Sequence, residues 1–148
     1  MRALVQRVSK AYVEVNEKKI SSIDKGLLVL VGIQDTDDQS DITWLSNKII
    51  KMRLFEDDNG KMNKSIKDVS GELLVVSQFT LHASTKKGNR PSFITAAHPD
   101  IALPLYQTFI TECQKQISTQ TGQFGAMTRV GLVNDGPVTI WLDSRNKE

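Results

Sequence analysis

The chain has 148 residues, of which 39% are apolar and 24% are charged. This length and apolar content suit one globular core, so we predict a single domain over residues 1–148. No apolar run approaches the roughly 18 residues of a membrane span, and no signal-peptide pattern opens the chain, which predicts a cytoplasmic protein without membrane association. The lone Cys113 cannot form an internal disulfide, which fits a reducing compartment. A net charge of +2 is too small to indicate nucleic-acid binding by itself.

The first half of the chain predicts strands followed by a helix. Residues 2–8 and 11–16 alternate between apolar and polar, 19–23 can pair behind a turn, and 27–33 read as a strand buried on both faces. Residues 39–54 carry apolar side chains at helical spacing. Acidic residues crowd the start of this helix, where negative charge is favoured: Asp35, Asp37, Asp38 and Asp41.

The second half predicts a buried strand over residues 73–76, a helix over 100–118, and strands over 127–134 and 137–142. Cys113 lies on the apolar stripe of that helix, so we interpret it as a packed small side chain and not as a nucleophile. Pro104 does not suit a helix interior, so the helix either kinks there or begins there. Because strands and helices do not alternate regularly, we predict an α+β fold with a mostly antiparallel sheet.

The buried strand is followed directly by Ser77, Gln78, Phe79 and Thr80, three polar residues and one aromatic residue. A central strand that ends in hydroxyl and amide groups delivers them to the rim of a pocket. Thr80 is the obvious nucleophile, but no base is readable nearby. Backbone N–H groups at Phe79 and Thr80 can instead stabilise an oxyanion. The alternative is that these side chains only cap the strand end by hydrogen bonds.

A Gly-Pro pair interrupts the last predicted strand pattern at Gly136 and Pro137, just after Asn134. Proline cannot donate to a sheet ladder, so it belongs at an edge or a bulge. X-Pro is also the one bond at which a cis peptide costs as little as about 0.5–1 kcal/mol. The pair therefore forms either a cis bond with an acceptor surface of carbonyl oxygens or a trans turn between two strands.

Charge and histidine placement leave few other candidates for a site. Lys86, Lys87 and Arg90 form a basic loop that either contacts phosphates or is a solvated surface. His82 and His98 lie far apart, fall in no catalytic triad pattern, and have no Cys-x-x-Cys or His-x-x-x-His partners. We therefore expect no metal and no cofactor.

Together these motifs resemble the D-aminoacyl-tRNA deacylase family, whose members hydrolyse the ester between a D-amino acid and tRNA. The resemblance covers nearly the whole chain and includes MRALVQRV (residues 1–8), GLLVLVG (26–32), KGNRPSF (87–93) and TGQFG (121–125). It implies a barrel-like antiparallel sheet with two outer helices, assembled as a homodimer. It also implies chiral proofreading of aminoacyl-tRNA, with activity on glycyl-tRNA as well, and catalysis assisted by the 2′-hydroxyl of the terminal adenosine.

In the family, a Gly-cisPro pair from one subunit enters the pocket of the other and leaves no space for an L side chain. The resemblance carries this role to Gly136 and Pro137, with Arg7 bracing their carbonyls and Asn134 helping to hold the motif. Without the resemblance, Arg7 reads equally well as a surface arginine on an edge strand. The family often has a methionine beside the pocket; here Met127 is followed by Thr128, so which of them faces the site stays open, and Phe124 and Met127 can equally be core.

Two other classes of protein fit the sequence less well. A non-catalytic RNA-binding module would need base-stacking aromatic residues on a sheet face, and only 6% of residues are aromatic. A general esterase would show a Gly-x-Ser-x-Gly elbow or a readable triad, and neither is present.

Overall fold

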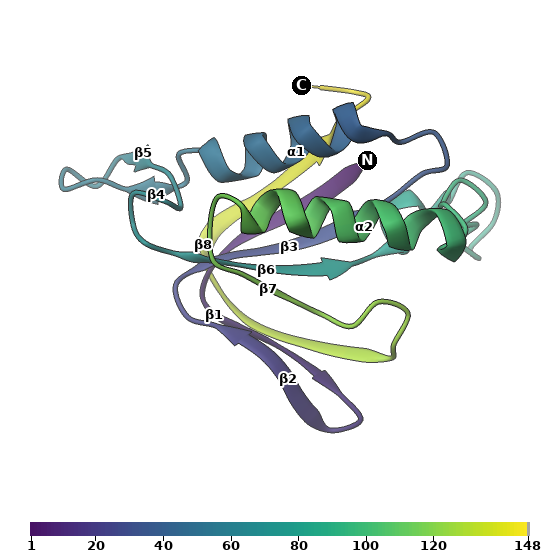
Figure 1. Ribbon diagram of the computed structural model, residues 1–148, viewed down its shortest axis with the longest axis horizontal. Coiled ribbons are helices and arrows are strands. Elements are labelled where there is room, and N and C mark those ends of the chain that lie inside the picture. Colours follow the sequence, from purple (N-terminus) through teal and green to yellow (C-terminus); the bar gives the residue numbers. More distant parts are fainter. Residues whose placement is uncertain (148) are drawn as a thin grey trace.

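The computed structural model describes residues 1–147 and contains one large curved sheet with two long helices over one face (Figure 1). In chain order the elements are β1 (Arg2–Val15), β2 (Lys18–Ile23), β3 (Gly26–Gly32), α1 (Gln39–Lys51), β4 (Phe55–Glu56), β5 (Met62–Lys64), β6 (Glu72–Ser77), the 3-10 helix η1 (Phe79–His82), α2 (Pro99–Gln114), β7 (Thr119–Thr121) and β8 (Thr128–Asp143). The barrel-like α+β fold predicted from the sequence is confirmed.

The sheet is organised around β1, which pairs antiparallel with β2, β3 and β8. The order across the sheet is β2-β1-β3-β6-β7, and β8 joins it through β1. The pairings of β3 with β6 and of β6 with β7 are parallel, which the sequence did not predict. Parallel neighbours need a long crossover, and α1 and α2 lie in these two connections. Both crossovers place their helices on the same face of the sheet (Figure 1).

Apolar side chains form two clusters on opposite sides of β3. The larger cluster lies under the helices and includes Leu27, Ile42 and Phe109, all 0% exposed. The smaller cluster lies on the other face and includes Leu28 and Leu74. Adjacent residues of β3 therefore enter different clusters, which confirms the prediction that this strand is buried on both faces. Full burial of each such side chain contributes about 1.5–3 kcal/mol.

The helices begin where the sequence predicts but end earlier. Asp38 caps α1 through a capping box with Asp41, and the helix ends before Met52, so the predicted end at residue 54 is wrong. Helix α2 begins at Pro99 and contains Pro104, so the alternative start at Pro104 is wrong. No helix within residues 1–147 is long and apolar enough to cross a membrane.

Cys113 lies in the core on α2, as predicted, and is 0% exposed. Burial raises the pKa of its thiol to about 12, with a smaller contribution from the nearby Glu112 carboxylate. Because the thiolate is the reactive form, Cys113 is inert at neutral pH. Its contribution is packing.

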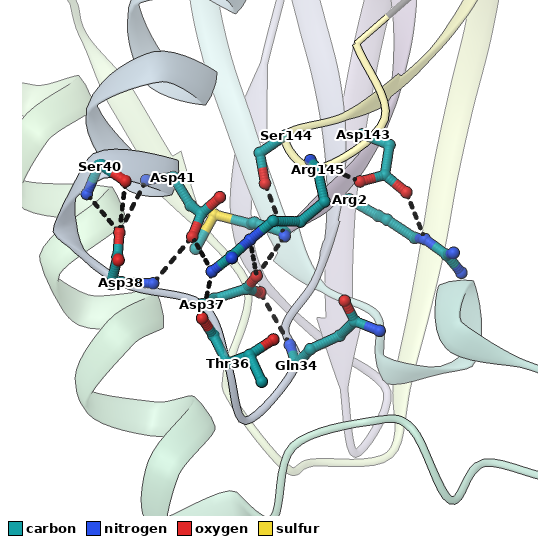
Figure 2. Close-up of polar contacts among 11 residues, drawn as sticks. Arg2, Gln34, Thr36, Asp37, Asp38, Ser40, Asp41, Asp143, Ser144 and Arg145 are labelled. Atoms are coloured by element: carbon teal, nitrogen blue, oxygen red, sulfur yellow. Dashed lines mark hydrogen bonds and ion pairs between the residues drawn. The ribbon is translucent and has the colours of Figure 1, made fainter.

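Polar contacts join the amino terminus, the start of α1 and the C-terminal segment, and Figure 2 shows Asp37, Asp41 and Arg145 among them. The α-amino group of Met1 lies 2.5 Å from Asp37 Oδ1, and both side chains are 0% exposed. The same amine donates to Ser144 Oγ at 2.8 Å. Arg145 Nη2 lies 2.7 Å from Asp41 Oδ2, so the C-terminal segment is tied to the start of α1. Asp37 and Asp41, expected from the sequence only to favour the start of the helix, therefore also neutralise the Met1 α-amino group and Arg145.

Candidate functional site

The polar residues after β6 form a tight turn. Gln78 N–H donates to Val31 O at 2.7 Å and so extends the pairing with β3, after which the chain enters η1. The first N–H groups of a helix have no partner within it. Within residues 1–147 no group accepts from the N–H of Phe79 or of Thr80. Two backbone N–H donors are therefore available at this turn.

A mostly apolar cavity of about 420 Å³ lies beside this turn. Ser77, Gln78 and Phe79 line it from the end of β6, and Ala97 and Ala102 line it from the loop before α2 and from α2 itself. The remaining lining residues are Val31, Ile33, Phe93, Ala96, His98, Pro99, Phe124 and Gly125. The cavity therefore combines an apolar wall with a short polar rim, which is the usual composition of a small-molecule site.

Thr80 is next to this cavity but is not among its lining residues. Its Oγ1 accepts a hydrogen bond from Gln78 Nε2 at 2.5 Å. The hydroxyl is thus held by an amide and not by a base, which argues against Thr80 as a nucleophile. The structure brings three of the four predicted residues to the cavity and ties the fourth to one of them.

The histidines provide no clear base. His98 lines the cavity, and its Nδ1 lies 3.1 Å from Asp100 Oδ2 in a pair that is largely exposed. His82 is 1% exposed, and neither ring nitrogen has a hydrogen-bond partner in the described part of the chain. Burial lowers the pKa of His82, so its ring is neutral at neutral pH. Over residues 1–147 no three His, Cys, Asp or Glu side chains come together as a metal site would require.

The Gly136–Pro137 peptide bond is cis, so the trans alternative is wrong. It lies in a bulge of β8: Gln6 pairs with Thr139 and Val8 with Asn134, which leaves residues 135–138 opposite the single residue Arg7. Gly136 and Pro137 are exposed and do not line the cavity of their own chain.

Arg7 lies beneath this bulge and is 5% exposed, so the alternative of a surface arginine on an edge strand is wrong. Its Nη1 donates to Leu54 O at 2.6 Å, and its Nε donates to Asp135 O at 3.0 Å. The guanidinium thus contacts the carbonyl before Gly136, whereas the resemblance implies the carbonyls of Gly136 and Pro137 themselves. Asn134 Nδ2 donates to Arg7 O at 2.9 Å and to Val138 O at 3.2 Å, which closes the bulge at its base.

Met127 and Thr128, either of which could face the site by sequence, do not line the cavity. Met127 is 91% exposed, so its assignment to the core is wrong. Neither Met127 nor Thr128 is among the lining residues, whereas Phe124 both lines the cavity and packs against the core.

The predicted basic loop is exposed along Lys86, Lys87 and Arg90. A two-way backbone pairing of Ser84 with Ser92 closes the loop at its base. The chain then continues through Phe93, whose ring contacts that of Phe79 edge to face at 5.1 Å between centroids. The cations therefore extend from the rim of the cavity.

Comparison with known proteins agrees with this architecture. The family model for D-Tyr-tRNA(Tyr) deacylase matches residues 4–143. A D-aminoacyl-tRNA deacylase of Flavobacterium psychrophilum is 57% identical, and one of Flavobacterium johnsoniae is 59% identical, each over 150 residues covering all of both chains. The chain belongs to the D-aminoacyl-tRNA deacylase family.

Two solved structures share the fold. One is described as c-Myc DNA Unwinding Element Binding Protein; it has a TM-score of 0.92 and 41% identity, covering 97% of this chain and 98% of that one. The other, described as a probable eukaryotic D-amino acid tRNA deacylase, has a TM-score of 0.81 and 15% identity, covering 95% and 97%. The second likeness concerns the fold alone.

Proposed function

We propose that the chain hydrolyses the ester bond of D-aminoacyl-tRNA and releases free tRNA and the D-amino acid. Full-length similarity to proteins named for this reaction supports the proposal. The structural observation that carries it is the turn at Phe79 and Thr80, where two unpartnered N–H groups lie beside an apolar cavity. Such donors stabilise the oxyanion that forms when an ester is hydrolysed.

In the proposed mechanism, water attacks the ester carbonyl carbon while the carbonyl oxygen receives hydrogen bonds from the N–H groups of Phe79 and Thr80. The ester C–O bond then breaks, and the ribose hydroxyl of the terminal adenosine leaves with a proton. The neighbouring 2′-hydroxyl of that adenosine orients and activates the water, which fits the absence of a base next to Thr80. Ser77 and Gln78 position the substrate at the rim, and neither a metal nor a cofactor takes part.

The selectivity proposal concerns Gly136 and Pro137. The pair enters the cavity of a partner subunit in a homodimer, where its carbonyl oxygens lie close to the substrate Cα and exclude a side chain of L configuration. A D-residue or glycine leaves that space free, so glycyl-tRNA is accepted as well. Both residues are exposed and neither lines the cavity of its own chain, which supports this arrangement. Discrimination of this kind relies on a clash with the wrong substrate.

The remaining proposals concern partners and place. Lys86, Lys87 and Arg90 contact phosphates of the acceptor end, because phosphate contacts provide much of the affinity for nucleic acid. The chain acts as a single domain over residues 1–148, in the cytoplasm where aminoacyl-tRNA is made.

The direct test is deacylation of D-Tyr-tRNA and L-Tyr-tRNA by the purified protein. We expect the D substrate to react at least about tenfold faster, which corresponds to about 1.4 kcal/mol of discrimination. Binding of both substrates without turnover would identify an RNA-binding module instead. Equal turnover of both would identify a non-selective esterase.

The mechanism is tested by removing the hydroxyl of Thr80. Thr80→Ala should keep substantial deacylation, because the proposed donors at this turn are backbone N–H groups. Replacing the terminal adenosine by its 2′-deoxy form should be far more damaging. If Thr80→Ala abolished single-turnover hydrolysis while the deoxy substrate reacted normally, a threonine nucleophile would have to replace this mechanism.

A further inference from the structure

Arg7 is a buried cation with one counter-ion. Its side chain is 7% exposed, and within residues 1–147 Asp135 provides the one carboxylate at ion-pair distance, with Oδ2 at 3.2 Å from Arg7 Nε. The same Nε donates to the backbone oxygen of Asp135 at 3.0 Å. A single N–H group of Arg7 therefore holds the main chain and the side chain of one residue together.

Asp135 is also the residue from which the Gly-Pro segment starts. Its carbonyl belongs to the peptide that leads into Gly136, so the bond from Arg7 sets the plane of that peptide. At the other end, Asn134 Nδ2 donates to Val138 O. Gly136 and Pro137 lie exposed between these two anchors.

The surroundings of this ion pair offer Arg7 no second carboxylate at ion-pair distance within residues 1–147. A small cavity of about 140 Å³ adjoins it, lined by Arg7, Lys25, Phe55, Glu56 and Asp135. Lys25 and Glu56 bring a further cation and a further acid to this cavity, but Glu56 is not within ion-pair distance of Arg7. The Arg7 side chain is 7% exposed and that of Asp135 is 51% exposed. Without the charge on Asp135, the guanidinium would keep its hydrogen bonds to the backbone oxygens of Leu54 and Asp135 but would lose its counter-ion, which is unfavourable for a largely buried cation.

We propose that the Asp135 carboxylate is a positioning residue for substrate selection: it fixes the guanidinium of Arg7 and, through it, the orientation of the Gly136–Pro137 segment. The proposal rests on the role given above to that segment. Asp135 touches no substrate in this account and acts through Arg7. Loss of its charge loosens the Arg7 contact and lets the segment shift, so L-aminoacyl-tRNA gains access before the D rate falls.

The test compares Asp135→Asn, which keeps the size and removes the charge, with Asp135→Glu, which keeps the charge. Asp58→Asn is the matched control, because Asp58 forms a 2.9 Å ion pair with Lys64 on the exposed β4–β5 hairpin. We expect Asp135→Asn to lower the ratio of D to L deacylation rates about tenfold, with kcat on D-Tyr-tRNA within about threefold of wild type. Asp135→Glu should recover most of the ratio, and Asp58→Asn should leave it unchanged.

A second readout reports on the contact itself and does not depend on catalysis. Hydrogen exchange of the Arg7 Nε–H, followed by ¹⁵N NMR, should become at least about tenfold faster in Asp135→Asn and stay slow in Asp58→Asn. Combining Asp135→Asn with Arg7→Lys should lower the ratio no further than Arg7→Lys alone, because the two residues act as one unit.

The outcomes separate the two proposals. A wild-type protein without D over L preference would remove the proposed function, and the Arg7 exchange rate would then decide whether Asp135 holds the guanidinium. A selective wild type whose ratio and Arg7 exchange are both unaltered by Asp135→Asn would overturn the role of Asp135 and leave the proposed function intact.

Discussion

At the scale of single residues, the contact between Met1 and Asp37 is the most enclosed ion pair in the described chain, with both side chains at 0% exposure. Removing one partner of a buried pair leaves an uncompensated charge. Asp37→Asn should therefore lower the free energy of unfolding by about 3–5 kcal/mol, measured by urea denaturation. Asp58→Asn, which breaks an exposed pair, should have no measurable effect. Similar losses in both variants would contradict the importance of burial.

His82 makes a pH-dependent contribution to stability. Burial lowers the pKa of its ring below the ordinary value of 6.5, so the unfolded chain takes up a proton first as the pH falls. The stabilisation is complete above pH 6.5 and is lost as the pH falls through the pKa of the folded state. The free energy of unfolding should therefore decrease from pH 7.5 to pH 5 by more in wild type than in His82→Leu. The free energy of unfolding is measured by urea denaturation at both pH values. An equal decrease in wild type and in His82→Leu would contradict this assignment.

At the scale of elements, the parallel contact of β3 with β6 depends on Gly26. A Cβ at this position would lie 1.9 Å from the backbone oxygen of Glu72, far inside contact distance. Gly26→Ala should therefore separate the two strands and lower the free energy of unfolding by about 1–3 kcal/mol or more. Gly122→Ala is the control, because its Cβ would meet side-chain atoms of Val76 at an ordinary 3.5 Å. Equal melting temperatures for the two variants would show that the strands can adjust.

Elements with a strong local pattern could be predicted, and their connections could not. The capping residues of α1 and the apolar run of β3 are local signals, and both elements begin within one residue of the predicted position, although α1 ends at Lys51 and not at residue 54. Residues 2–8 and 11–16 instead form one strand, β1, because Ser9 and Lys10 face solvent on a strand whose two halves share β8 as a partner. The parallel pairings depend on long crossovers, which leave no local mark in the sequence.

The site shows the same division. The Ser77 to Thr80 turn and the Gly-Pro pair could be found from the sequence, because both consist of consecutive residues. The burial of Arg7 depends on β1 lying between β3 and β8, and its contact with Leu54 joins residues 47 positions apart. Asp135 has no distinctive sequence signal, because an acid between Asn134 and Gly136 is typical of an ordinary turn.

At the scale of the whole molecule, the proposed sites are made from two chains, so defects in different motifs should complement each other. A Gln78→Ala chain lacks a rim residue of its cavity, and a Pro137→Ala chain lacks the proposed inserted motif. Mixing the two inactive proteins under subunit exchange should restore hybrid sites in which both motifs are intact. The measurement is D-Tyr-tRNA deacylation before and after mixing. Full activity of a wild-type protein verified as a monomer would exclude a shared site.

The pairing of β1 with β8 also has a consequence in time. It joins residues 2–15 to residues 128–143, and the contact of Arg7 with Asp135 lies within it. Contacts between residues so far apart in sequence close large loops and form slowly. During synthesis β1 is made first and β8 nearly last. The edge of β1 that pairs with β8 therefore stays unpaired through most of translation, and Arg7 lacks its contacts with Asp135 for the same time. The Gly136–Pro137 segment, which is proposed to set substrate selection, is thus among the last parts of the sheet to form. A partly synthesised chain can contain Ser77 to Thr80 at the rim of the cavity and still lack this segment.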